Sequence, residues 1–176
     1  MLRSSVDRVA VPDTRRLSEL YLRHADDAVR LAYLLTGDSA LAEDIVQDAF
    51  VRLAGRLVHL RDPDAFHAYL RRTITNLSKS HFRRKRVERA YLAGAHGATG
   101  AHDDRWSGPS VEDRDALWRA LGRLTTRQRA ALVLRFYEDL PEREVADILN
   151  CRPGTVKSLV SRGLETLRIE IEGEGR

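Results

Sequence analysis

The chain has 176 residues, which suffices for one ordinary domain or two small ones. Charged residues make up 32% of it and aromatic residues 6%, a composition typical of a soluble protein with a modest core. The single cysteine, Cys151, excludes a disulfide within the chain, and no stretch is apolar over the length that crosses a bilayer. The N-terminus has no apolar signal-peptide segment, so the sequence predicts a cytoplasmic protein.

Arginine greatly outnumbers lysine among the basic residues. The net charge is only +4, but 27 of the 30 basic residues are arginine. Arginine suits the recognition of phosphates and base edges. A GC-rich genome produces the same bias, so the placement of the charges along the chain has to decide between the two explanations.

Three amphipathic helices are predicted in the first half of the chain. Apolar residues recur every 3.6 residues in segments that begin near Leu17, Leu41 and Asp64. Gly37 ends the first segment, polar residues at 38 and 39 can cap the second, and Pro63 separates the second from the third. The third segment continues into the basic run SKSHFRRKR.

A change of composition after about Arg89 predicts a flexible linker. The stretch AGAHGATGAHDDRWSGPS is rich in glycine, alanine, serine and histidine and has no apolar period. No role is assigned to Trp106 within it. Helical periodicity returns near Val111 and persists through four segments, one of which starts at Pro141, a favoured position for proline. In the segment TTRQRAALVLRFYEDL, the residues expected to build a core are Ala130, Leu132, Val133, Leu134 and Phe136.

No strand-like alternation is long enough to predict a sheet. The expected fold class is therefore all-α, with two small helical domains joined by a flexible linker. The expected boundaries are a tail over 1–16, a first domain over 17–89, the linker over 90–110, a second domain over 111–171 and a tail over 172–176.

The second domain ends in a pattern typical of a helix-turn-helix, LPEREVADILNCRPGTVKSLVSRGLETLR. Asn150 and Cys151 form the predicted turn, and apolar residues at 156, 159, 160, 164 and 167 of the second helix face inward. Five polar residues, with no acid among them, then face outward: Thr155, Lys157, Ser158, Ser161 and Arg162. Such a face near a helix N-terminus favours phosphate and base-edge contacts in the major groove. An ordinary helical hairpin with a solvated face remains the alternative.

Basic and aromatic residues gather along the third predicted helix. The polar and basic ones are Arg71, Arg72, Thr75, Asn76, Lys79, Arg83, Arg84, Lys85 and Arg86. Rings at Tyr69, His81 and Phe82 stand beside them, and single-stranded nucleic acid is bound by such a mixture because bases stack while phosphates pair with cations. Core packing is the simpler interpretation of Tyr69 and Phe82, and a solvated helix end is the simpler one of the basic run.

The second predicted helix has the opposite character. Its acidic strip consists of Glu43, Asp44, Gln47 and Asp48. Such a strip would not face DNA. It is either a solvated face or a docking face for a basic partner protein.

Taken together, these segments resemble the extracytoplasmic-function sigma factors of bacterial RNA polymerase. The segment ALAEDIVQDAFVRL is similar to the second conserved region of that family, and DAFHAYLRRTITNLSKSHFRRKR to its promoter-melting and minus-ten-reading segment. The segment from LTTRQRAALVLRFYEDL to the C-terminal helix is similar to the fourth region, and NCRPGTVKSLVSRGLETLR especially to an actinobacterial subgroup labelled SigE-like. The resemblance covers nearly all of Leu17 to Ile169 apart from the linker.

The resemblance implies a fold of two sigma domains, regions 2 and 4, and a role for each group of residues. Contact with the clamp helices of the polymerase's largest subunit is implied for Asp38, Asp44, Gln47 and Asp48. Minus-ten recognition and melting are implied for Arg61, Asp64, Phe66, Tyr69, Arg72, Thr73, Asn76, Lys79, Arg83, Arg84 and Arg86. Minus-thirty-five recognition is implied for Arg152, Thr155, Lys157, Ser158, Ser161 and Arg162.

The implied partners are core RNA polymerase, promoter DNA as duplex and as melted strand, and an anti-sigma factor. Apolar residues of the fourth region would pack on the flap of the second-largest subunit, and the linker would thread toward the RNA exit path. Three positions depart from the family pattern. Tyr69 replaces a common tryptophan, SKSH lacks a common aspartate, and Arg152 replaces a serine that would cap the recognition helix.

Two other classes of function remain open. A stand-alone helix-turn-helix regulator that binds duplex DNA as a dimer explains the C-terminal motif but not the acidic strip or the Asn76 segment. A metal protein or enzyme could use His96, His102, Asp103 and Asp104, but they stand in the predicted linker, where rigid geometry is not expected. No grouping resembles a catalytic triad or paired acids, so we expect no enzymatic activity, cofactor or metal.

Overall fold

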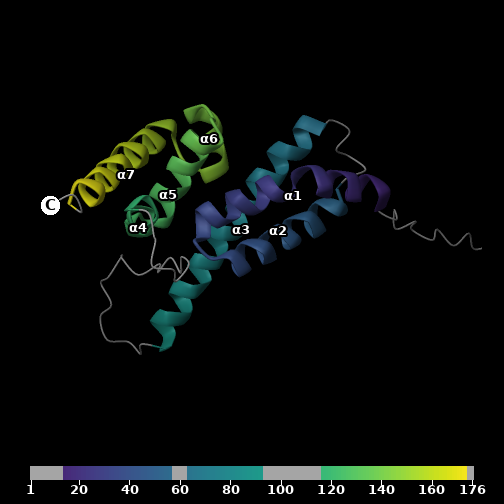
Figure 1. Ribbon diagram of the computed structural model, residues 1–176, viewed down its shortest axis with the longest axis horizontal. Coiled ribbons are helices and arrows are strands. Elements are labelled where there is room, and N and C mark those ends of the chain that lie inside the picture. The colour runs from purple at the N-terminus through teal and green to yellow at the C-terminus, as the bar shows by residue number, and fades with distance from the viewer. Residues whose placement is uncertain (1–13, 57–62, 93–115, 174–176) are drawn as a thin grey trace, which may run out of the picture.

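The computed structural model describes residues 14–56, 63–92 and 116–173, and these segments are helices joined by short turns (Figure 1). The first unit consists of α1 (Thr14–Thr36), α2 (Ser39–Ala54) and α3 (Pro63–Leu92). The second consists of α4 (Ala116–Arg123), α5 (Thr126–Leu132), the π-helical turn η1 (Val133–Tyr137), α6 (Glu142–Leu149) and α7 (Pro153–Gly173). The all-α fold class is confirmed. The predicted linker falls mostly outside the described residues, and α3 continues three residues beyond the expected end at 89.

The turn between α1 and α2 is built as its sequence predicts. Gly37 takes a positive φ of 72°, which a glycine adopts without strain, and its N–H donates to Tyr33 O at 2.7 Å. Asp38 then caps α2, because its side chain accepts a hydrogen bond from Leu41 N at 3.0 Å. The two helices therefore return antiparallel to each other.

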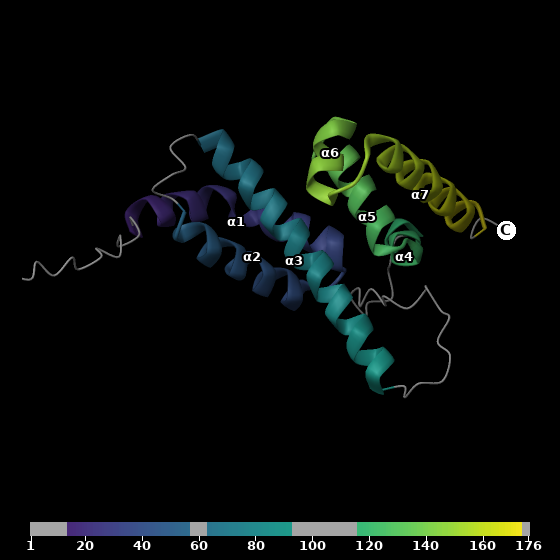
Figure 2. The same cartoon turned by 180° about the vertical axis from the view of Figure 1, so that it is seen from behind.

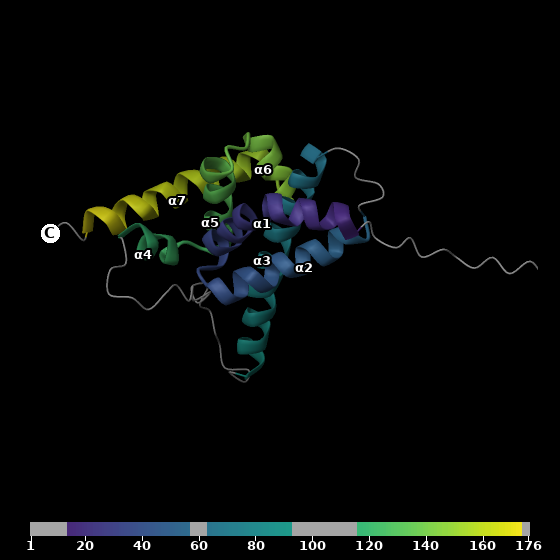
Figure 3. The same ribbon diagram turned by 45° about the vertical axis from the view of Figure 1, so that its right-hand side comes forward.

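The long helix α3 packs across this pair with its apolar side. Phe66, Leu70 and Ile74 are buried against the apolar faces of α1 and α2. The C-terminal part of α3, which carries the basic run, extends beyond the other helices (Figures 2 and 3). Because the core covers only part of α3, its remaining surface is open along much of its length.

In the second unit, α5 begins with a complete capping box. Thr125 Oγ1 accepts from Gln128 N, and the Gln128 side chain accepts from Thr125 N, so two otherwise unpaired amides at the start of α5 are satisfied. Asn150 ends α6 in the left-handed conformation (φ 51°), which turns the chain into α7. The predicted helix-turn-helix is thus formed by α6, Asn150 to Arg152, and α7.

Two residues expected in the core are on the surface. Phe136 is 57% exposed because it lies two residues beyond the buried Leu134, on the opposite side of the helical turn. Leu164 is 45% exposed because it stands at the edge of the buried face of α7, next to Gly163. The predictions for these two side chains were wrong, whereas Val156 is fully buried as expected.

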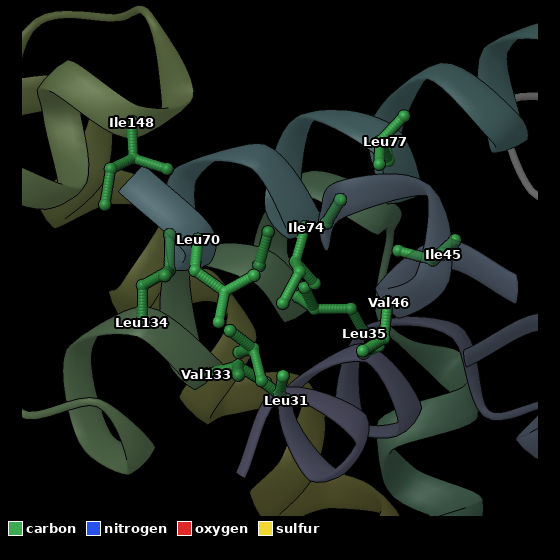
Figure 4. Close-up of a cluster of buried hydrophobic side chains, with 14 of the residues drawn as sticks. Leu31, Leu35, Ile45, Val46, Leu70, Ile74, Leu77, Val133, Leu134 and Ile148 are labelled. Carbon is green, nitrogen blue, oxygen red and sulfur yellow. The ribbon is translucent and has the colours of Figure 1, made fainter. Parts of the chain in front are cut away.

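The two units share one hydrophobic core. Leu31 and Leu35 of α1 and Leu70 and Ile74 of α3 belong to the same buried cluster as the valine and leucine of η1 at 133 and 134 (Figure 4). The rings of Tyr33 and Trp118 add a contact between α1 and α4, with centroids 5.0 Å apart. A sequence pattern of two domains and a linker does not predict this packing.

Candidate nucleic-acid interface

The outward face of α7 is polar and carries cations. Thr155, Lys157, Ser158, Ser161 and Arg162 are all exposed, as their spacing predicts. At 100° per residue they occupy one side of the helix, opposite the buried Val156 and Gly163. The structure therefore brings all five together on one surface, which we call the α7 face.

The start of α7 is organised by its backbone. Pro153 is the first helical residue, and Arg152 O accepts from Thr155 N at 2.9 Å and from Val156 N at 3.3 Å. The Arg152 side chain is exposed beside the α7 face. The positive end of the helix dipole adds to these cations, so this end of α7 attracts anions.

A second polar surface runs along α3. Its members share the side of the helix opposite the buried residues: Tyr69, Arg72, Thr73, Asn76, Lys79, Arg83 and Arg86. We call this surface the α3 stripe. Arg84 is also exposed and lies at its edge. The stripe places one ring, one amide and several cations in line, which suits a strand of nucleic acid.

Two of the three rings named with this helix are not available for stacking. Phe82 is 3% exposed and packs in the interior, whereas Tyr69 is 45% exposed. His81 is half-buried against Phe82, with ring centroids 5.6 Å apart. Burial, with Lys85 and Arg84 nearby, lowers the pKa of His81 below its ordinary value. Tyr69 is therefore the ring that the stripe presents.

Phe66, which precedes the α3 stripe in the sequence, is buried and does not lie on the surface. Phe66 is 1% exposed, and its ring packs against His24 and Phe50 at centroid distances of 5.6 and 5.9 Å. It belongs to the core and not to the α3 stripe. Arg61 and the side chain of Asp64 lie outside the described residues.

The acidic strip forms a third surface, which we call the α2 acidic face. Glu43, Asp44, Gln47 and Asp48 are exposed on α2, opposite its buried face. Figures 1 and 3 show α2 on the side of the first unit away from α6 and α7. Asp38 stands apart from this acidic face, because its carboxylate is engaged as the cap of α2.

Lys79 differs from the rest of the α3 stripe because it is half-buried. Its Nζ donates to Leu149 O, at the end of α6, at 3.3 Å. Burial, with Arg127 nearby, lowers the pKa of Lys79 below its ordinary value. The stripe is thus partly covered by the helix-turn-helix.

Sequence reasoning missed the polar groups between the two units. Arg129 is fully buried, and its guanidinium donates to Leu121 O, Leu124 O and Leu35 O at 3.0–3.1 Å. Arg71 is 9% exposed and pairs with carboxylates of the second unit. The sequence analysis placed Arg71 and Thr75 with the polar and basic residues of this helix, but both are buried, because the second unit packs on that side of α3.

Two kinds of feature are absent from residues 14–56, 63–92 and 116–173. No group of three or more His, Cys, Asp or Glu side chains there is placed to hold a metal ion. No helix among them is both long and apolar enough to cross a membrane. The candidate ligands His96, His102, Asp103 and Asp104 lie outside the part of the chain that the structure describes.

Comparisons with known proteins agree with the two-unit arrangement. Residues 20–88 match the family model for sigma-70 region 2, and residues 114–167 match that for sigma-70 region 4. The chain is 36% identical to an RNA polymerase sigma-E factor of Streptomyces avermitilis, over 88% of this chain and 84% of the relative. It is 34% identical to the ECF RNA polymerase sigma factor SigE of Mycolicibacterium smegmatis, over 92% of this chain but only 63% of that protein.

The fold is also similar to a solved structure. The sigma factor RpoE from Bartonella quintana, crystallised with the anti-sigma factor NepR, superposes with a TM-score of 0.67 at 23% identity. The superposition covers 90% of this chain and 98% of the other. At this identity the likeness concerns the arrangement of the helices alone.

Proposed function

We propose that this chain, which belongs to the sigma-70 family of RNA polymerase sigma factors and to its extracytoplasmic-function group, uses three separate surfaces in transcription initiation. The α2 acidic face binds the clamp helices of core polymerase. The α7 face reads the minus-thirty-five element. The α3 stripe binds the minus-ten strand as it melts. The protein acts in the cytoplasm as a specificity subunit without catalytic chemistry of its own.

The observation that carries this proposal is the separation of the three surfaces by charge. The α2 acidic face is exposed on a helix that carries neither cationic surface, on the side of the first unit away from α6 and α7, so it would repel the DNA that the cationic surfaces attract. A stand-alone helix-turn-helix regulator has no use for such a face. A polymerase subunit needs one surface for a protein partner and two for DNA.

Each cationic surface suits a different form of DNA. The α7 face sits at the N-terminal half of the second helix of a helix-turn-helix, which enters the major groove in such motifs. The α3 stripe offers Tyr69 for base stacking, the Asn76 amide for base edges, and Arg72, Arg83 and Arg86 for phosphates. Capturing unstacked bases offsets the cost of opening the duplex.

The residues outside these surfaces are assigned by the same proposal. Arg61, Asp64 and Phe66 form a pocket for a flipped minus-ten base, which requires Phe66 to leave its buried position or to act as the floor of the pocket. Arg84 and Arg152 contact phosphates. An anti-sigma factor is the expected regulatory partner.

Titration of core polymerase with labelled protein tests the first step. Reversing Asp44 and Asp48 to lysine removes two negative charges from the α2 acidic face, so we expect core affinity to fall at least about tenfold. Reversing the exposed Glu172, at the far end of α7, is the control for a single charge reversal elsewhere and should leave the affinity unchanged. Equal core affinity of the wild type and the Asp44/Asp48 variant would remove the assignment of this face.

A further inference from the structure

The C-terminal end of α3 projects from the molecule and carries exposed apolar side chains. Beyond the buried Phe82, no residue of α3 from 83 to 92 is buried, and this end extends past the other helices (Figures 2 and 3). Packing supplies most of the stability of helices in proteins, and this helix end gains little of it. Exposed apolar side chains gathered at such a place indicate contact with a partner.

Val87 and Tyr91 lie on the same side of the helix as the α3 stripe. At 100° per residue, Val87 stands about five full turns beyond Tyr69, and Tyr91 is turned by only about 40° from both. Val87 is 62% exposed and Tyr91 is 86% exposed, well above the 45% of Tyr69. The stripe therefore has an exposed ring near each end, about 22 residues or roughly 33 Å apart along the helix axis.

The charges of this helix end fit a polyanion. Residues 83–92 include five basic side chains and one acid, Glu88. The cations outweigh both that acid and the partial negative charge at the C-terminus of a helix. An open hollow on this end is lined by Arg83, Arg84, Val87, Glu88 and Tyr91. Guanidinium groups and tyrosine hydroxyls both donate to phosphate oxygens, so the hollow suits a phosphate of a nucleic-acid backbone.

Duplex DNA fits this end better than a melted strand does. Between Asn76 and Tyr91 the stripe offers cations but no exposed ring, so it lacks the successive rings on which unstacked bases stack. Tyr91 lies about 15 residues or roughly 22 Å beyond Asn76, the length of about six base pairs. The chain continues from this end of α3 to the unit that carries the α7 face, so the duplex on the minus-thirty-five side is the one expected here.

We propose that Tyr91 and Val87 bind the backbone of the promoter duplex just upstream of the melted segment, with the Tyr91 hydroxyl on a phosphate and Val87 against a sugar. The inference rests on the proposed function and adds a contact that holds the upstream edge of the melted segment. The match to sigma-70 region 2 ends at residue 88, whereas α3 continues to Leu92. Tyr91 is therefore outside the residues that this match covers.

Binding of the holoenzyme to two forked templates tests this contact. Both carry the melted minus-ten strand of the promoter that the holoenzyme selects, and neither extends to the minus-thirty-five element. One has about three base pairs of upstream duplex, which end before the position reached by Tyr91, and the other has about ten, roughly 34 Å. Tyr91→Ala should bind the shorter template like the wild type. It should bind the longer template about five- to tenfold more weakly, the loss expected for one hydrogen bond to a charged phosphate.

Two further variants sharpen the test. Leu92→Ala is the matched control, because Leu92 is also exposed but is turned by about 100° from Tyr91 around the helix. It should bind both templates like the wild type. Tyr91→Phe keeps the ring without the hydroxyl and should lose most of the same affinity for the longer template. Wild-type affinity of Tyr91→Phe would overturn the phosphate contact.

The outcomes separate this contact from the function on which it rests. Equal affinity of Tyr91→Ala and the wild type for the longer template would overturn the proposal. An equal loss on both templates would overturn it as well, since the ring would then act through the protein itself and not through the upstream duplex. Binding of the shorter template by the wild-type holoenzyme is the reference, because it leaves the assignment of the α3 stripe standing whatever Tyr91 does.

Discussion

At the scale of single residues, a substitution in the α7 face can distinguish a side chain that contacts bases from one that contacts phosphates. Arg162 is exposed at the C-terminal end of this face, one turn beyond Ser158. Arg162→Ala should cost about 1–3 kcal/mol on the preferred minus-thirty-five sequence and flatten the preference at one or two base pairs. Binding across a set of single-base promoter variants measures this. Arg168→Ala, farther along α7, is the control. A uniform loss across all the variants would show that Arg162 touches phosphate only.

Arg129 is expected to govern stability and not recognition. Its buried guanidinium donates to three main-chain carbonyls, at the end of α4 and at the end of α1. Arg129→Met fills similar space but leaves those acceptors without this donor, so unfolding free energy should fall by about 3 kcal/mol or more. Urea unfolding monitored by circular dichroism measures it, with the exposed Arg127→Met as control. A change below about 0.5 kcal/mol would mean that the carbonyls find other donors.

Two histidines of the first unit predict a pH dependence of stability. The pKa of His24 is lowered by burial and by His67 and Arg23 nearby, and that of His81 by burial and by Lys85 and Arg84. The unfolded chain therefore binds protons on these rings more readily than the folded protein. Stability is highest above the ordinary histidine value near 6.5 and decreases as the pH falls through it.

Thermal unfolding at pH 7.5 and pH 5.2 measures this dependence. We expect a lower Tm at pH 5.2 for the wild type and a smaller difference for the His24→Gln/His81→Gln variant. An equal difference in the wild type and the double variant would assign the pH effect to other groups.

At the scale of elements, the Asp38 carboxylate could serve in two ways, as the cap of α2 and as a contact with polymerase. Asp38 accepts from Leu41 N, and it was also expected to contact polymerase. Asp38→Asn keeps a good cap without the charge, whereas Asp38→Ala loses about 1 kcal/mol of helix stability. If Asp38 acts through the cap alone, core affinity should be unchanged in Asp38→Asn. A loss of affinity in Asp38→Asn at full stability would assign a direct contact to the charge.

The closeness of α5 and α7 depends on one glycine. A Cβ added at Gly163 would lie 2.8 Å from Leu132 Cδ1, which is itself buried. Gly163→Val should therefore force the two helices apart and cost about 1–3 kcal/mol. Differential scanning calorimetry measures the loss, with Gly154→Val, whose added Cβ would meet open space, as the control. Equal stability of the two variants would show that Leu132 moves aside freely.

At the scale of the whole molecule, the sequence predicted the elements better than their assembly. The 3.6-residue period located the faces of α1, α2 and α3, and Gly37, Asp38 and Asn150 marked turns that the structure confirms. Periodicity identifies a buried face but not the element that buries it. The shared core between the units and the pairing of Arg71 with Glu138 therefore could not be predicted, since those residues are 67 positions apart.

The candidate surfaces could be predicted because they depend on the helical period and not on how the helices assemble. Exposed residues on one helix face are set by the helical period alone, so the α7 face and the α2 acidic face lie where expected. Phe66 is buried in the core, where the resemblance implied a role in minus-ten recognition. Phe82 is buried as core packing predicts, whereas Tyr69 is 45% exposed although core packing was the simpler interpretation for it too. Lys79 is half-covered only because the second unit packs on α3, which again depends on long-range assembly.

The central claim is that this chain gives core polymerase its choice of promoter. Run-off transcription from a genomic promoter pool, by core polymerase with and without the purified protein, tests it most directly. The account predicts new transcripts that begin downstream of one shared pair of promoter elements, and their loss with Asp44→Lys/Asp48→Lys. Absence of new transcripts, together with tight binding of a palindromic duplex by the free protein, would contradict it and would leave a stand-alone regulator.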